Sequence, residues 1–283
     1  MTDPTAVQTF TTDLPSSARG YGWMLGGKDN YQVDRDMVVE ILQRFPANLD
    51  SSRANRRFLG RAVRHLAAEH GVRQFIDLGC GLPTDNNVHQ VAQNIDPNAR
   101  VVYVDTDPLV LAHGRALLAD DATTTAIITA DMRDPNAVLN DPQTRRLIDF
   151  NEPYAILMFS VGHHLRDDDG HPRFLIDALL MAGPRINYLA FSQAVDENAH
   201  RGRQMADTFN AAGIPWQNRT PQQVDAMLDG LEVVEPGLVN VQEWRPDPFE
   251  PKLPPIPADL AEWEGASKLT PEAYEYGGVL FLP

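Results

Sequence analysis

From residue 73 onward, short apolar runs alternate with longer segments whose apolar residues recur at helical spacing. The apolar runs predict five strands, at 73–78, 101–105, 126–129, 154–160 and 186–192. The segments that follow them predict five helices, at 85–95, 108–119, 136–148, 172–182 and 199–212. Because strands that alternate with helices are joined by right-handed crossovers, this pattern predicts a doubly wound α/β sheet with parallel strands.

The pattern changes towards the C-terminus. A short helix is expected at 221–229, and two β-like runs lie at 231–241 and 277–282. Between these runs, six prolines in residues 245–257 disfavour regular structure and indicate an extended loop. The two runs are expected to close the sheet as an antiparallel pair. The predicted fold is therefore a Rossmann-like, mostly parallel sheet of seven strands.

A helical extension precedes the sheet. Helices are expected at 33–44 and at 53–70, with Ser51 and Ser52 placed to cap the second one. Residues 1–16 are rich in Thr, Asp and Pro, so we expect them to be poorly ordered.

Residues 17–32 form a segment of unusual composition. Four glycines stand among Tyr, Trp, Lys and Asp, which argues against a plain helix. Two interpretations are equally open: a lid that folds over a ligand, or an arm packed for stability or for contact in a homodimer. Both divide the chain at residue 72, into an extension at 1–72 and a cofactor-binding domain at 73–283.

Composition narrows the class of protein. The 283 residues include 24 basic and 39 acidic side chains, a formal net charge of −15, which disfavours a nucleic acid as the partner. Cys80 is the only cysteine, so no intramolecular disulfide can form. No apolar run approaches the ~20 residues that span a membrane. The polar start of the chain lacks the pattern of a secretion signal, and we expect a cytoplasmic protein.

The candidate chemistry begins where the first strand ends. The run from Phe75 to Leu78 leads into the turn Gly79-Cys80-Gly81, and the next strand ends on Asp105, 24 residues after Gly81. Glycines at such a turn let the backbone approach a nucleotide-like ligand, and the acid can accept hydrogen bonds from ribose hydroxyls. The sequence therefore predicts a cofactor that contains adenosine.

Three features favour S-adenosylmethionine over NAD. The dinucleotide fingerprint is broken, since Thr84 takes the place of its third glycine. Asp77 is placed to meet an amino group and would repel a pyrophosphate. Asp131 follows the third strand, where it can accept a hydrogen bond from the adenine amino group. Five further residues complete the predicted cofactor site: Thr106, Met132, Ser160, Gly26 and Arg56.

The order of these residues resembles that of class I S-adenosylmethionine-dependent methyltransferases. A closer resemblance spans nearly the whole chain and is to an actinobacterial methyltransferase family whose members are mostly of unknown substrate. Four motifs carry it: Leu25–Asn30, Asn55–Leu59, Gln74–Asp77 and Tyr103–Pro108. The class I glycine motif usually has a third glycine where this chain has Pro83. The resemblance implies the fold and the cofactor, and it implies no substrate.

Two histidines follow the fourth strand. His163 or His164 can serve as a general base, since imidazole changes charge near neutral pH. The plainer interpretation, which we favour, is a loop histidine that hydrogen-bonds locally. The acidic run that follows, up to His171, lacks the spacing of a metal site.

These observations predict an S-adenosylmethionine-dependent methyltransferase that acts on an O or N atom of a small molecule. A protein that binds S-adenosylmethionine or S-adenosylhomocysteine without transferring the methyl group is the first alternative. An NAD-dependent oxidoreductase is the second, and the broken fingerprint argues against it. Methylation of nucleic acid is disfavoured by the net charge.

Overall fold

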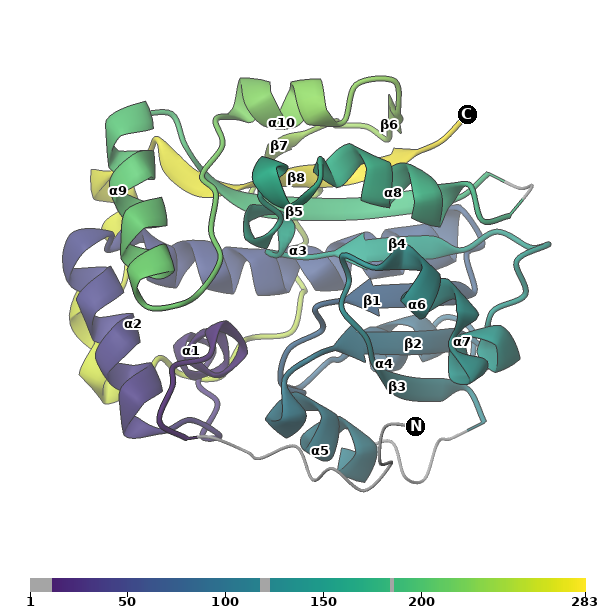
Figure 1. Cartoon of the computed structure of the whole chain (residues 1–283), viewed down its shortest axis with the longest axis horizontal. Helices are drawn as coiled ribbons and strands as arrows, with labels where there is room; N and C mark the ends of the chain where they lie inside the picture. The colour runs from purple at the N-terminus through teal and green to yellow at the C-terminus, as the bar shows by residue number, and fades with distance from the viewer. Residues whose placement is uncertain (1–11, 118–122, 184–185) are drawn as a thin grey trace.

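A single mixed β-sheet organises the protein. The computed structural model describes residues 12–117, 123–183 and 186–283, and in these ranges eight strands form the sheet. Their order is β3, β2, β1, β4, β5, β8 and β6, and β7 also pairs with β8 (Figure 1). The strands are β1 (Gln74–Leu78), β2 (Arg100–Asp105), β3 (Thr125–Thr129), β4 (Ala155–Met158), β5 (Tyr188–Asp196), β6 (Glu232–Val233), β7 (Val239–Asn240) and β8 (Ala273–Phe281).

The pairing confirms the predicted fold class. Strands β3, β2, β1, β4 and β5 are parallel, and β8 runs antiparallel to β5 along nine residue pairs. The sheet has eight strands, not seven, because the expected strand at 231–241 is interrupted. Pro236 and Gly237 separate β6 from β7, and each of the two short pieces pairs with β8. No helix or strand occurs at 245–257, as the prolines predict.

Helices cover both faces of the sheet (Figure 1). Successive side chains of β1 point to opposite faces, so that Phe75 packs in one core cluster and Ile76 in another. The first cluster contains residues of α3 (Ala47–Glu69) and α4 (Val88–Gln93). The second contains residues of α6 (Pro135–Asn140), α7 (Pro142–Leu147), α8 (Pro172–Leu180) and α10 (Pro221–Met227). Helix α5 (Pro108–Leu117) also lies beside the sheet. Its expected end at 119 lies outside the described residues.

The N-terminal extension builds a third core cluster. Helices α1 (Ser17–Met24) and α2 (Gln32–Arg44) pack with α9 (Ala199–Ala211), beyond the carboxyl ends of β1 and β2 (Figure 1). Four short 3-10 helices complete the fold: Gly162–His164, Asp167–Asp169, Ala258–Trp263 and Ala266–Leu269. Within the described ranges, every helix is too short or too polar to span a bilayer.

The glycine-rich segment at 17–32 corrects one prediction, because α1 is a helix. A Cβ atom added to Gly20 would lie 2.8 Å from Met37 Cε and 3.0 Å from Val38 Cγ2 of α2. A side chain at position 20 would therefore displace the end of Met37, so this glycine suits the close approach of two helices and not a turn. The expected disorder of residues 1–16 falls mostly on residues 1–11, which lie outside the described residues.

Three helix boundaries also differ from those predicted. Helix α3 begins directly after Pro46, so Ser51 and Ser52 lie buried inside it and do not cap it. The helix expected at 136–148 is two helices, since Pro142 lacks the N–H that would continue α6. The helix expected at 85–95 is reduced to α4.

Candidate functional site

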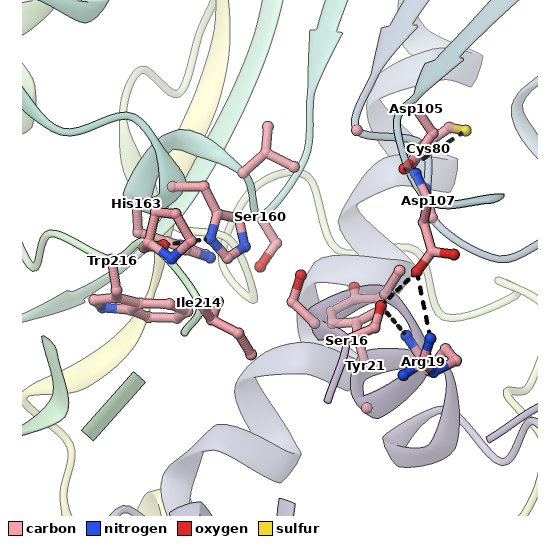
Figure 2. A pocket seen from close by; sticks show the side chains of 18 of the residues that line it. Ser16, Arg19, Tyr21, Cys80, Asp105, Asp107, Ser160, His163, Ile214 and Trp216 are labelled. Atoms are coloured by element: carbon pink, nitrogen blue, oxygen red, sulfur yellow. Dashed lines mark hydrogen bonds and ion pairs between the residues drawn. The ribbon is translucent and has the colours of Figure 1, made fainter. Parts of the chain in front are cut away.

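A cavity of about 560 Å³ opens where the parallel strands end. That volume is typical of sites for cofactors and small molecules. It is lined by residues from α1, α2 and α3 on one side and by the loops after β1, β2, β3 and β4 on the other. Figure 2 shows two groups across it, one around Asp105 and Cys80 and one around His163 and Trp216. After the roles that the sequence predicts, we call the group around Asp105 and Cys80 the cofactor end. The group around His163 and Trp216 is the acceptor end.

The glycine turn forms the floor of the cofactor end. Gly79 and Gly81 have φ angles of +64° and +65°, a conformation that L side chains rarely adopt. A Cβ at Gly79 would lie 2.8 Å from Val161 Cγ1, whereas one at Gly81 would meet no atom within 4 Å. Gly79 is thus fixed by packing, and Gly81 exposes its backbone to the cavity.

Asp105 holds this turn together. Its Oδ2 accepts the N–H of Gly81 at 2.9 Å, and its Oδ1 accepts the N–H groups of Thr106 and Asp107 at 2.8 and 2.9 Å. Burial raises the pKa of Asp105, and these three N–H bonds oppose that rise. Cys80 Sγ also donates to Asp105 Oδ2 at 3.9 Å, a weak thiol contact that a ribose hydroxyl could replace.

Asp77 lies at the buried end of β1 and lines the cavity. Burial raises the pKa of its carboxyl to about 7, although the charge of Arg56 lowers it and that of Asp105 raises it further. Among the described residues, no group hydrogen-bonds to this carboxylate. An ammonium group placed against it would be well matched in charge.

Asp131, Met132 and Thr106 also line the cavity, as predicted from their places after β3 and β2. Asp131 is half-exposed at its margin and forms an ion pair with Arg133 at 2.6 Å. The hydrogen bond from Arg133 is the main reason why the pKa of Asp131 is lowered. This carboxylate therefore stays ionised at the margin of the cavity.

Two predicted site residues lie elsewhere. Gly26 packs on the proline-rich loop, where a Cβ would lie 2.9 Å from Pro254 Cβ. Arg56 donates to the backbone carbonyls of Asp85 and Asn86 at 3.0 and 3.1 Å. Neither residue lines the cavity, and Arg56 acts on it only through the turn that it anchors and through its charge near Asp77.

The histidines differ in what they can do. His163 Nδ1 accepts the N–H of Ala194 at 3.1 Å, so the neutral ring carries its proton on Nε2. Burial, together with the charges of His164 and Arg219, lowers its pKa well below 6.5. His164 Nδ1 donates to the Pro215 carbonyl at 2.8 Å, which leaves its Nε2 with a free lone pair. Nδ1 of His163 is thus occupied as an acceptor, whereas His164 keeps a free Nε2 that can accept a proton.

An aromatic stack forms the wall beside these histidines. The Trp216 ring lies between His163 and Phe209, with centroid distances of 3.7 and 3.9 Å. Both faces of the indole are covered, so only its edge is left for a ligand. Nothing in the local sequence pattern of Trp216 places it beside a strand end, so the sequence alone does not mark it as a site residue.

The N-terminal arm contacts the cofactor end through Ser16 and Arg19. Ser16 Oγ donates to Asp107 Oδ2 at 2.7 Å, and Arg19 Nε donates to Asp34 Oδ2 at 2.7 Å (Figure 2 shows the contacts of Asp107). Asp107 also caps α5, since its Oδ1 accepts the N–H of Leu109 at 2.8 Å. The same carboxylate thus joins the arm to the loop after β2.

Glu275 is the largest omission from the predicted site. It is the third residue of β8, is 3% exposed and lines the cavity. Ser160 Oγ donates to its Oε1 at 2.7 Å. A single glutamate in a terminal strand carries no motif, so its position could be recognised only after the strands are paired. The described ranges contain no group of three or more His, Cys, Asp or Glu side chains placed to hold a metal ion.

Comparison with known proteins agrees with this geometry. The sequence model of the S-adenosyl methyltransferase family matches residues 3–279. A crystal structure of a protein from Streptomyces avermitilis, of a family of unknown function, is 36% identical with a TM-score of 0.84, over 96% of this chain and 99% of that one.

A second structure, of a Thermobifida fusca protein described as a methyltransferase, is 40% identical with a TM-score of 0.79. The match covers 95% of this chain and 96% of that one. No curated protein matches the sequence. The chain belongs to the S-adenosyl methyltransferase family, and its cofactor is S-adenosylmethionine.

Proposed function

We propose that the protein transfers the methyl group of S-adenosylmethionine to an O or N atom of a small molecule held in the acceptor end. One observation carries this proposal: the strand-end acids and the aromatic wall share a single cavity. A protein that only bound the cofactor would need the cofactor end alone. The presence of the acceptor end therefore favours an enzyme.

The chain's own residues fit the cofactor. In this assignment Asp77 accepts from the α-ammonium group, Asp105 from the ribose hydroxyls, and Asp131 from the adenine amino group. The exposed backbone at Gly81 allows close approach, as its missing neighbours within 4 Å imply. The bound cofactor supplies an activated methyl group on a sulfonium.

Catalysis then rests mainly on position. Well-oriented reactants reach effective molarities of ~10⁵–10⁸ M, so the protein needs above all to aim the acceptor atom at the methyl carbon. Apolar residues of α2 and the wall at Trp216 surround that atom and limit access of water. A large polymer does not suit a cavity of about 560 Å³ whose rim includes the arm from Leu14 to Met24.

Calorimetric titration of the purified protein with S-adenosylmethionine, S-adenosylhomocysteine and NAD tests the cofactor assignment. We expect saturable binding of the first two and none of NAD. Transfer of labelled methyl to a library of small molecules then separates an enzyme from a binding protein. Binding without any transfer would favour the non-catalytic alternative.

A further inference from the structure

The acceptor end contains a buried acid whose hydrogen-bonding capacity is incompletely used. Glu275 Oε1 accepts from Ser160 Oγ, but Glu275 Oε2 has no hydrogen-bond partner among the described residues. Asn48 Nδ2 and Trp216 Nε1, which belong to residues that line the same cavity, are likewise without a partner there. Buried polar atoms are normally paired, so Glu275 keeps unused hydrogen-bonding capacity beside its contact with Ser160.

Ser160 connects this acid to the two ends of the cavity. Figure 2 shows its side chain between the group around His163 and the group around Asp107. Its φ angle of +55° is strained for serine, and its N–H is held by Ser192 Oγ at 2.9 Å. A chain of bonds continues from Ser192 Oγ to Asn55 and from Asn55 to the hydroxyl of Tyr21. The surrounding structure thus fixes Ser160 in a costly conformation, which is typical of functional positions.

The charges of the cavity indicate the class of acceptor. Both arginines among its lining residues are paired, Arg19 with Asp34 and Arg133 with Asp131. No unpaired cation is therefore left in the described lining for a carboxylate or phosphate. The aspartates of the lining all belong to the cofactor end, and Glu275, the acid of the acceptor end, already accepts the hydrogen bond from Ser160. An uncharged, largely apolar molecule with a hydroxyl group suits this end.

We propose that Ser160 and Glu275 form a proton relay for the hydroxyl of an uncharged, mostly apolar acceptor. The acceptor oxygen forms a bond to the methyl carbon, and the bond between that carbon and the sulfonium sulfur breaks. The hydroxyl proton passes to Ser160 Oγ while Ser160 passes its own proton to Glu275 Oε1. This inference rests on the proposed function and adds to it the substrate class and the destination of the proton.

The electrostatics of Glu275 support the relay. Burial raises the pKa of Glu275 to about 8, and the hydrogen bond from Ser160 opposes the rise. A base works best when its pKa lies near the working pH, and an ordinary glutamate would be too weak. On α1, the titratable group that interacts with the charge of Glu275 is Tyr21. Burial raises the pKa of Tyr21 far above neutral pH, so Tyr21 stays uncharged. On the β5 side, Ala194 pairs with Glu275 and donates its N–H to the neutral His163.

The test measures transfer of labelled methyl from S-adenosylmethionine to matched ring compounds: 1-naphthol with related one- to three-ring hydroxyl compounds, 1-naphthoic acid and 1-naphthylmethylamine. We expect transfer to hydroxyl compounds, with a rate that rises with pH to a plateau above about 8. Glu275→Gln should lower this rate about 10²-fold or more and remove the rise with pH. Ser160→Gly should do the same, and glycine relieves the strain at φ +55° so that folding is retained.

Glu262→Gln serves as the control, because this glutamate is exposed and lies outside the cavity lining. Wild-type rates and pH dependence in Glu275→Gln would overturn the relay, as would loss of the pH rise in His164→Gln alone. Transfer only to the acid or the amine would overturn the substrate class and leave the proposed function standing. A protein that binds the cofactor but transfers methyl to none of the compounds would contradict both.

Discussion

The two ends of the cavity are built in different ways. The cofactor end is made by short turns directly after β1, β2 and β3, and Asp105 links two of these turns through three backbone N–H groups. The acceptor end collects single side chains from distant parts of the chain, such as Ser160, Trp216 and Glu275. The first end is therefore a property of the fold, and the second is a property of this particular sequence.

The comparison teaches where specificity can change. Substitutions at the cofactor end disturb the turn that carries the strand ends, so they affect stability and cofactor binding together. Substitutions at the acceptor end exchange isolated side chains on finished strands and loops, and can alter the acceptor without altering the fold.

The largest expected effect is a change in the free energy of unfolding when Glu275, at the acceptor end, is replaced by Gln. Burial raises the pKa of Glu275 from its ordinary 4.5 to about 8, so its contribution to stability is full below pH 4.5 and is lost as the pH rises through 8. Glu275→Gln should therefore be more stable than wild type at pH 9, by up to about 5 kcal/mol, and equal at pH 4.5. Urea unfolding at the two pH values measures the difference. If the variant were less stable than wild type at pH 9, burial of the ionised Glu275 carboxylate would not destabilise the protein.

A pair of glycine variants tests the cofactor end. Ala at either position pays about 1–2 kcal/mol for the left-handed backbone. Gly79→Ala should lose about 1–3 kcal/mol more, since its Cβ would lie 2.8 Å from Val161 Cγ1 and that of Gly81 would meet nothing within 4 Å. Urea unfolding compares the two free energies. Equal losses would contradict the close packing of Gly79.

Asp105→Asn should weaken binding of S-adenosylmethionine about 10- to 100-fold. The expected loss is that of a charge-assisted hydrogen bond, about 1.5–3 kcal/mol. The matched control is Asp131→Asn, whose carboxylate is half-exposed and already paired with Arg133, so the loss should be smaller. Calorimetry on both variants gives the comparison. A greater loss in Asp131→Asn would move the main cofactor contact away from β2.

The smallest expected effect is a pH dependence of cofactor binding. The pKa of Asp77 is raised to about 7 by burial, and the ionised form is the one that attracts an ammonium group. Affinity for S-adenosylmethionine should therefore fall as the pH drops below 7, by up to about tenfold per pH unit, or 1.4 kcal/mol. Calorimetry between pH 5.5 and 7.5 tests this. Asp77→Asn should bind weakly with no such dependence, and the same slope in that variant would assign the titration to another group.

Much of the fold follows from the sequence, because each part of it leaves a local pattern. The apolar run before Gly79 and the acid at Asp105 lie within a few residues of the elements that they define, so strands and cofactor acids could be predicted together. Helix α1 could not, since Gly20 is explained only by contact with Met37 and Val38 of α2. Local sequence patterns thus predict most strands and helices, whereas an exception such as α1 depends on packing between elements.

The acceptor end could be predicted only at its histidines and at Ser160, which the sequence assigned to the cofactor site. His163 and His164 follow directly after the loop of β4, so their place near the strand ends was expected. Their hydrogen bonds to Ala194 and Pro215 were not, and these bonds determine which ring keeps a free nitrogen. Glu275 faces Ala194 only through the antiparallel register of β8, a long-range pairing without a local signal.

The separation of the two ends is tested most directly by titrating S-adenosylmethionine into wild type, Asp105→Asn and Glu275→Gln at one pH in the calorimeter. The structure predicts that Glu275→Gln binds the cofactor as wild type does, while Asp105→Asn loses affinity. An equal loss in both variants, or a loss in Glu275→Gln alone, would contradict a cavity with distinct cofactor and acceptor ends.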